Sequence, residues 1–169
     1  WSQVGDGLPF RVSTLAALDD GHGPAFYAGG YERFAKWNGI EWTIFSAGPR
    51  RSISDFVVFD DGSGPAIYIG GSLYSNTFQL LNGVAKWDGH RLTSVGNPLV
   101  GWATALAVYD DGLGEALYAA GYFSIDGVEP RTQRLLKWNG STWKKAGGKV
   151  DWISDLDVFD DGSGPALFA

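Results

Sequence analysis

The chain has 169 residues, of which 44% are hydrophobic and 15% aromatic, and this apolar content excludes an intrinsically disordered protein. Its formal net charge of -6 argues against general nucleic-acid binding, because neutralising phosphates requires clustered lysine and arginine. The apolar runs fall far short of the roughly 18 residues that a membrane span requires, and the absence of cysteine excludes disulfides and thiolate metal sites.

One phrase recurs along the chain. Each copy consists of Asp-Asp-Gly, a variable residue and a second glycine, followed by an apolar run. The aspartate pairs are Asp19–Asp20, Asp60–Asp61, Asp110–Asp111 and Asp160–Asp161. The first aspartate therefore advances by 41, 50 and 50 residues. A period of this length, in a chain without helical periodicity, is typical of repeat architectures.

Four strand-like runs fill each complete unit. In the second unit they are 53–59, 66–71, 84–87 and 91–95. The Asp-Asp-Gly phrase joins the first run to the second, and Asp88–Gly89 joins the third to the fourth. Asn-Gly and Asp-Gly are strong hairpin signals because both residues tolerate a positive φ. The other two complete units have Asn38–Gly39 and Asn139–Gly140 at this place.

Four antiparallel strands in about 50 residues predict one blade of a β-propeller. We therefore expect an all-β chain, a β-propeller of four-stranded antiparallel blades with about three and three-quarter repeats over residues 1–169. The units are expected at 10–47, 51–96, 101–147 and 151–169, with residues 1–5 as an outer strand, which makes 15 strands. We expect the remaining strands in a longer polypeptide; a ring shared by two copies and a self-closed ring are the alternatives.

Large aromatic residues recur at matching places in the third and fourth strands. Trp37, Trp87 and Trp138 occupy the third strand. Trp1, Trp42, Leu92 and Trp143 occupy the fourth. Because aromatic side chains contribute the largest buried areas, we expect the third-strand tryptophans to be buried between adjacent sheets.

The third strand and its turn read apolar-apolar-Lys-Trp-Asn/Asp-Gly at 34–39, 84–89 and 135–140. Together with the Asp-Asp-Gly turn and the Gly-Gly pair of the second strand, these residues resemble the propeller repeats of Kelch-like and related bacterial surface proteins. The resemblance extends over nearly the whole chain and implies the fold without implying a ligand. With the acidic, thiol-free composition, it leads us to expect an extracellular, cell-surface or periplasmic protein.

The two ends of such sheets differ in content. The Asp-Asp-Gly and Asn-Gly turns share one end, and the connections at the other end vary in length and sequence. Function tends to reside on variable loops above a rigid scaffold. The candidate ligand-binding residues at this variable end are Tyr74, Asn76, Trp102, Tyr122, Asp126, Glu129, Arg131 and Trp152. Such side chains suit sugar or peptide recognition. The alternative is that the loops are simply solvated and that the two tryptophans, which lie near the start of an innermost strand, pack at a channel rim.

The aspartate pairs raise calcium binding as an alternative to a purely structural role, because carboxylates at a glycine-rich turn are hard-cation ligands. The residues concerned are Asp60, Asp61, Asp110, Asp111, Asp160 and Asp161. Their spacing lacks the Asp-x-Asp-x-Asp order and the distal glutamate of an EF-hand. We therefore expect Asp60, Asp110 and Asp160 to accept hydrogen bonds from their own turns, with no metal or other cofactor.

No catalytic constellation is evident in the sequence. Both histidines, His22 and His90, belong to turns, although a carboxylate pair such as Asp126 with Glu129 or Asp155 stays open for glycoside cleavage. We expect a non-enzymatic binding or structural scaffold module whose partner is a protein, a glycan, further blades of the same polypeptide or a second copy. The alternative is a carbohydrate-binding or carbohydrate-active propeller, either a lectin or a glycoside hydrolase or lyase.

Overall fold

The computed structural model describes residues 4–45, 52–73, 81–96, 99–125, 131–148 and 151–169. These residues form fourteen β-strands, which confirms the expected all-β class. Within the described ranges, no helix is long and apolar enough to cross a membrane.

Three antiparallel sheets have four strands each, in chain order, and a fourth sheet has two. The first contains β1 (Val12–Asp19), β2 (Pro24–Gly30), β3 (Phe34–Trp37) and β4 (Trp42–Phe45). The second contains β5 (Ile53–Asp60), β6 (Pro65–Gly71), β7 (Val84–Trp87) and β8 (Leu92–Ser94). The third contains β9 (Val100–Asp110), β10 (Glu115–Ser124), β11 (Thr132–Trp138) and β12 (Trp143–Lys145), and the fourth β13 (Asp157–Asp160) and β14 (Pro165–Phe168). The sequence-predicted four-stranded antiparallel unit is therefore confirmed.

The expected outer strand at residues 1–5 is only partly described, since residues 1–3 lie outside the described ranges. Val4 and Gly5 are not in a strand, and the chain turns there, with Gly7 N–H donating to the Val4 carbonyl oxygen at 3.3 Å. The carbonyl of Val4 also accepts a hydrogen bond from the indole Nε1 of Trp42 at 3.1 Å. This short segment is thus held against the first sheet through its backbone.

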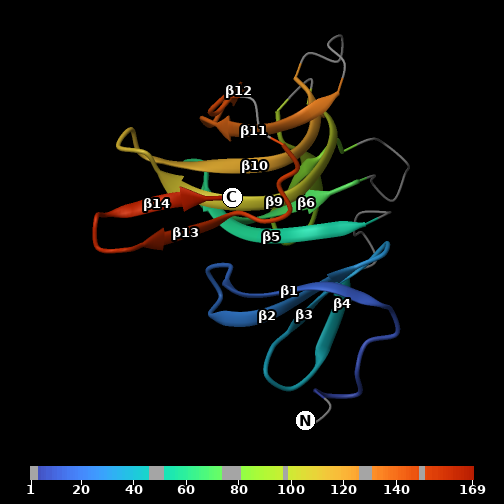
Figure 1. The fold of residues 1–169 in the computed structure, drawn as a ribbon. Coiled ribbons are helices and arrows are strands. Elements are labelled where there is room, and N and C mark those ends of the chain that lie inside the picture. The colour runs from blue at the N-terminus through green and yellow to red at the C-terminus, as the bar shows by residue number, and fades with distance from the viewer. Residues whose placement is uncertain (1–3, 46–51, 74–80, 97–98, 126–130, 149–150) are drawn as a thin grey trace.

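Successive sheets contact each other through their first strands. β1 contacts β5, β5 contacts β9, and β9 contacts β13 (Figure 1). Glycines in the second strands permit the close approach: a Cβ on Gly29 would lie 2.6 Å from Cζ of Phe56, and one on Gly70 would lie 3.0 Å from Cγ of Leu106. The described residues form a succession of sheets in which no closed barrel or ring is present.

Polar contacts also cross between the sheets. Asp55 Oδ2 accepts a hydrogen bond from the backbone N–H of Leu106 at 2.8 Å. At matching places, the Ser13 hydroxyl lies 3.0 Å from the carbonyl oxygen of Ile53, and the Thr104 hydroxyl 2.8 Å from that of Ile153. A side chain that bonds to backbone therefore connects β1 with β5 and β5 with β9, and another connects β9 with the segment before β13.

The hydrophobic core lies between successive sheets. One cluster contains Phe34, Phe56 and Trp87, and another contains Leu106 and Trp138. Trp87 and Trp138 are 5% and 7% exposed, as the sequence predicts.

The prediction is wrong for Trp37, which is only half-buried. The reason is its place in the first sheet. Trp87 packs against Phe34 and Phe45 of the preceding sheet. Trp37 has Trp42 of its own sheet, at 5.4 Å between ring centroids, and the backbone of Gly5.

Candidate functional site

The first aspartate of each pair caps its own turn. Asp60 Oδ1 accepts hydrogen bonds from the backbone N–H groups of Gly62 at 2.8 Å and Gly64 at 2.9 Å. Both glycines have a positive φ, which aims their N–H groups at the carboxylate. Asp19, Asp110 and Asp160 make the same pair of bonds. The expected role of Asp60, Asp110 and Asp160 is thus confirmed.

The second aspartate belongs to a triad that the sequence analysis missed. Asp61 Oδ2 accepts hydrogen bonds from Lys86 Nζ and from the Tyr68 hydroxyl, both at 2.8 Å. The register of the sheet explains this, because Lys86 lies directly opposite Tyr68 on neighbouring strands. The same triad occurs as Asp20–Tyr27–Lys36 and as Asp111–Tyr118–Lys137. Two sequence signals could have indicated the triad. They are a tyrosine seven residues after the aspartate and a lysine directly before the third-strand tryptophan.

The contacts within each triad keep the aspartate ionised and the tyrosine protonated, which suits a structural role and not a catalytic one. Burial opposes ionisation of Asp20, yet hydrogen bonds from Lys36 and Tyr27 outweigh it and hold the pKa of Asp20 at about 2. Burial and the hydrogen bond to Asp61 raise the pKa of Tyr68 above its usual range. At neutral pH the carboxylate is therefore charged and the phenol neutral, so neither is poised for proton transfer.

These pKa shifts predict a loss of stability in acid. The ordinary aspartate pKa is 3.8, and that of Asp20 in the folded chain is about 2. As the pH falls from about 4 towards 2, the unfolded chain binds protons that the folded triads do not, so the free energy of unfolding decreases. We expect Lys86→Met to lower it by about 1–2 kcal/mol at pH 7 and to flatten this acid dependence, as measured by urea unfolding.

The matched control is Lys144→Met in β12, because Lys144 is exposed and no ion pair to it is present among the described residues. We expect this variant to unfold as the unchanged chain does at every pH. An equal loss in both variants would contradict a role for the triad.

The contacts that the aspartate pairs make favour a structural role over calcium binding. The first aspartates already accept two backbone bonds each, and three of the second aspartates are paired with lysine. Among the described residues, no group of three or more histidine, cysteine, aspartate or glutamate side chains could hold a metal ion.

We therefore expect the thermal unfolding midpoint, measured by circular dichroism, to be the same in millimolar calcium as in millimolar magnesium. Titration calorimetry provides the opposing result: saturable uptake near one calcium ion per Asp-Asp-Gly turn would overturn the structural role of these aspartates.

At the variable end, the structure brings two of the predicted residues together. Trp102 of β9 lies directly opposite Tyr122 of β10, and their rings stack at 4.9 Å between centroids and 30° between planes. Both are half-buried. Gln133 of β11 lies opposite Tyr122 in turn, so the three residues make one row across three strands.

Gln133 is not among the candidate residues named from the sequence. It lines a cavity of about 500 Å³ together with Tyr122 and Arg134. Its side-chain nitrogen and oxygen are buried and have no hydrogen-bond partner among the described residues. An amide in this state can both donate to and accept from a ligand. Because Gln133 is distant from Trp102 in the sequence, the sequence alone did not indicate that the two residues lie in one row.

The other candidates are not gathered at this row. Arg131 is exposed just before β11, and Trp152 is 67% exposed. Trp152 precedes β13 by several residues, so it does not lie at the start of an innermost strand as expected. Tyr74, Asn76, Asp126 and Glu129 lie outside the described residues.

The candidate site is therefore the row of Trp102, Tyr122 and Gln133, on three adjacent strands of the third sheet. It offers a half-buried aromatic stack and an unpaired amide beside a cavity. The chain has no significant match to a known family model, to a curated protein or to a solved structure.

Proposed function

We propose that this chain is a non-enzymatic binding module, formed as part of a β-propeller of the Kelch-like kind that its sequence resembles. Support for the propeller comes from three four-stranded antiparallel sheets that contact one another through their first strands. The module serves a secreted or surface-attached protein and binds its partner, a protein or a glycan, at the variable end.

The row of Trp102, Tyr122 and Gln133 is the observation on which this proposal depends. Stacked aromatic rings present a rigid apolar surface that loses little conformational entropy on binding. The unpaired amide of Gln133 adds a polar contact that specifies orientation. The triad carboxylates, in contrast, are occupied by lysine and tyrosine, which supports binding over chemistry.

A carbohydrate-binding propeller is the second candidate, because aromatic faces and amides together suit sugar rings and hydroxyls. A glycosidase needs two carboxyl groups across the scissile bond. Asp55 and Asp155 line one open cleft, but each accepts a hydrogen bond from the backbone N–H of the residue that follows it. This engagement favours a lectin over a hydrolase.

Glycan and peptide arrays probed with the labelled full chain test the proposal. We expect saturable binding to one ligand class that Tyr122→Ala weakens at least tenfold, since aromatic anchors dominate binding energy. The matched control is Tyr31→Ala, because Tyr31 follows β2 at the place where Tyr122 lies in β10 and is 65% exposed. Release of reducing sugar from any polysaccharide would overturn the non-enzymatic proposal, and equal effects of both variants would overturn the site.

A further inference from the structure

Asparagine followed by glycine occurs three times in the chain, at Asn38–Gly39, Asn82–Gly83 and Asn139–Gly140. An asparagine before glycine is readily deamidated, because glycine has no side chain to hinder attack of its backbone nitrogen on the asparagine Cγ. The first and third pairs lie in the turns that join the third and fourth strands of their sheets, and Asn82–Gly83 directly precedes β7. The surroundings of each pair therefore decide whether it reacts.

The two turn pairs are exposed and loosely packed. Asn38–Gly39 and Asn139–Gly140 are exposed at all four residues. A Cβ built on either glycine would meet nothing within 4 Å, so these glycines have room to move. The matching Asp88–Gly89 turn is also exposed, although its sheet contacts a neighbouring sheet on each side. The exposure therefore belongs to the turn itself.

The turn around Asn38 places hydrogen-bond donors on the oxygen that gains charge during deamidation. Asn38 Oδ1 accepts hydrogen bonds from the backbone N–H groups of Ile40 and Glu41, each at 2.9 Å. Attack on Cγ converts this carbonyl oxygen into an oxyanion. Positioned N–H donors stabilise such an oxyanion, so the turn that caps Asn38 also favours the reaction.

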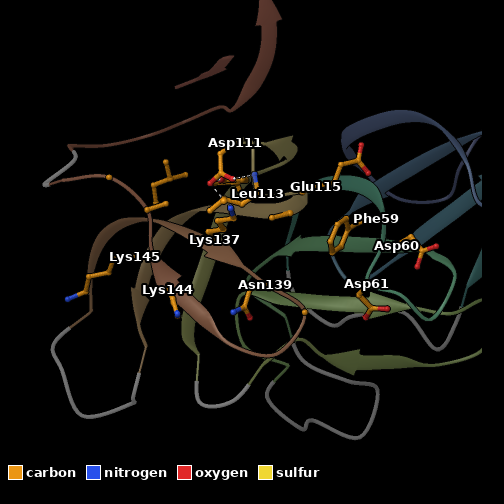
Figure 2. Close-up of a pocket in the computed structure, with 17 residues that line it drawn as sticks. Phe59, Asp60, Asp61, Asp111, Leu113, Glu115, Lys137, Asn139, Lys144 and Lys145 are labelled. Carbon is orange, nitrogen blue, oxygen red and sulfur yellow. Dashed lines mark hydrogen bonds and ion pairs between the residues drawn. The ribbon is translucent and has the colours of Figure 1, made fainter. Parts of the chain in front are cut away.

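Asn139 has the same arrangement with one more close donor. Its Oδ1 accepts hydrogen bonds from the backbone N–H groups of Ser141 at 3.1 Å and Thr142 at 2.8 Å. The Ser141 hydroxyl lies 3.1 Å from the same oxygen. Figure 2 shows the Asn139 side chain apart from the bonded Asp111 and Lys137, so the triad of this sheet does not hold it.

Asn82–Gly83 has surroundings that oppose the reaction. Asn82 is 9% exposed, and its Nδ2, the atom that must leave, donates to the Ser94 hydroxyl at 3.1 Å. The Gly83 carbonyl accepts a hydrogen bond from the N–H of Gly71 at 3.0 Å. A Cβ on Gly83 would overlap the ring of Phe123. Movement of the Gly83 nitrogen towards Cγ therefore requires local opening of the structure.

The second sheet already contains the acid that deamidation produces. Asp88 lies where the other two sheets have Asn38 and Asn139. Its Oδ1 accepts hydrogen bonds from the backbone N–H groups of His90 at 2.9 Å and Arg91 at 2.8 Å. These bonds hold the pKa of Asp88 below its usual range. An aspartate in the other two turns is expected to be ionised at neutral pH and to cap the turn as asparagine does.

We propose that Asn38 and Asn139 are sites of spontaneous deamidation in the folded protein, whereas Asn82 is protected. The backbone nitrogen of the following glycine loses its proton and bonds to Cγ, and Nδ2 leaves as ammonia after taking up a proton. Water then opens the resulting succinimide at either carbonyl group, which yields aspartate or isoaspartate. Each conversion adds one negative charge to a chain of formal net charge -6. Neither turn contains a residue of the ligand row, so the modification does not depend on ligand binding.

Peptide mass spectrometry of the full chain, incubated at physiological temperature and mildly alkaline pH, measures the three rates separately. In guanidinium chloride the chain is unfolded, and we expect the three pairs to convert at similar rates. Folding is expected to slow Asn38 and Asn139 by less than about tenfold and Asn82 by more than about tenfold. Asn82 is the matched control, because it shares the dipeptide and differs only in its surroundings. Stronger protection of either turn pair, or weaker protection of Asn82, would overturn the proposal.

The products provide a second test. Peptides that contain converted Asn38 or Asn139 are expected to hold isoaspartate as well as aspartate, because both arise from the succinimide. Aspartate alone would rule out attack by the glycine nitrogen. The double variant Asn38→Asp/Asn139→Asp is expected to keep the thermal unfolding midpoint within about 2 °C of that of the unchanged chain. A larger decrease would contradict the inference from Asp88 that the fold accepts the acid.

Discussion

Replacing Trp87 with alanine is expected to lower the free energy of unfolding by about 3–5 kcal/mol. The indole is 5% exposed and meets Phe34 edge-on, at 5.3 Å between centroids and 84° between planes. Phe45 of the same neighbouring sheet lies 5.2 Å away. The substitution removes buried apolar area and leaves a cavity between the first and second sheets. Urea unfolding at pH 7, followed by circular dichroism, measures the loss.

Trp37→Ala provides the matched control, because Trp37 occupies the same place in the first sheet and is half-buried. Its indole contacts Trp42 of its own sheet, and no ring of another sheet stacks on it among the described residues. We expect a cost of about 1–2 kcal/mol. If both variants lost the same stability, burial between sheets would not be what distinguishes Trp87.

Gly96→Ala is expected to cost about 3 kcal/mol or more, from two additive causes. The residue has a φ of 72°, which side chains other than glycine rarely adopt. The added Cβ would also lie 2.6 Å from atoms of both Trp138 and Trp143, which are buried and cannot move aside. Thermal and urea unfolding should both show the loss, accompanied by a change in tryptophan fluorescence.

Gly147→Ala separates these two causes. Gly147 has nearly the same φ, 77°, but open space around its Cβ position. We expect only the conformational cost, about 1 kcal/mol. A loss as large as that of Gly96→Ala would show that the backbone angle accounts for the whole effect and that close packing on the tryptophans contributes nothing.

Turns and strands could be predicted from the sequence because their causes are local. Asp60 needs only the N–H groups of Gly62 and Gly64, within four residues of itself. The Asp88–Gly89 hairpin aligns Trp87 with Leu92 in the same local way. The period then groups such elements into units, because each unit carries the same turns in the same order.

The triads could not be predicted in this way, because they depend on register. Asp61 and Lys86 are 25 residues apart, and a segment of variable length lies between them. Only the pairing of β6 with β7 places the lysine opposite Tyr68 and hence beside the aspartate. A one-residue slip of that register would direct the lysine to the other face of the sheet.

The sequence alone determined the strand content, the turn chemistry and the four-stranded unit, since each arises from contacts between near neighbours. Tertiary structure decided which matching residues have the same environment. Trp37 and Trp87 have the same local sequence, yet only Trp87 is buried, because a neighbouring sheet supplies Phe34 and Phe45 around it. Gly96 and Gly147 share a backbone angle, yet only Gly96 is packed under indoles. The physical reason is that burial depends on the interface between sheets and charge pairing depends on the register between strands of one sheet. A strand's own residues do not specify either of them.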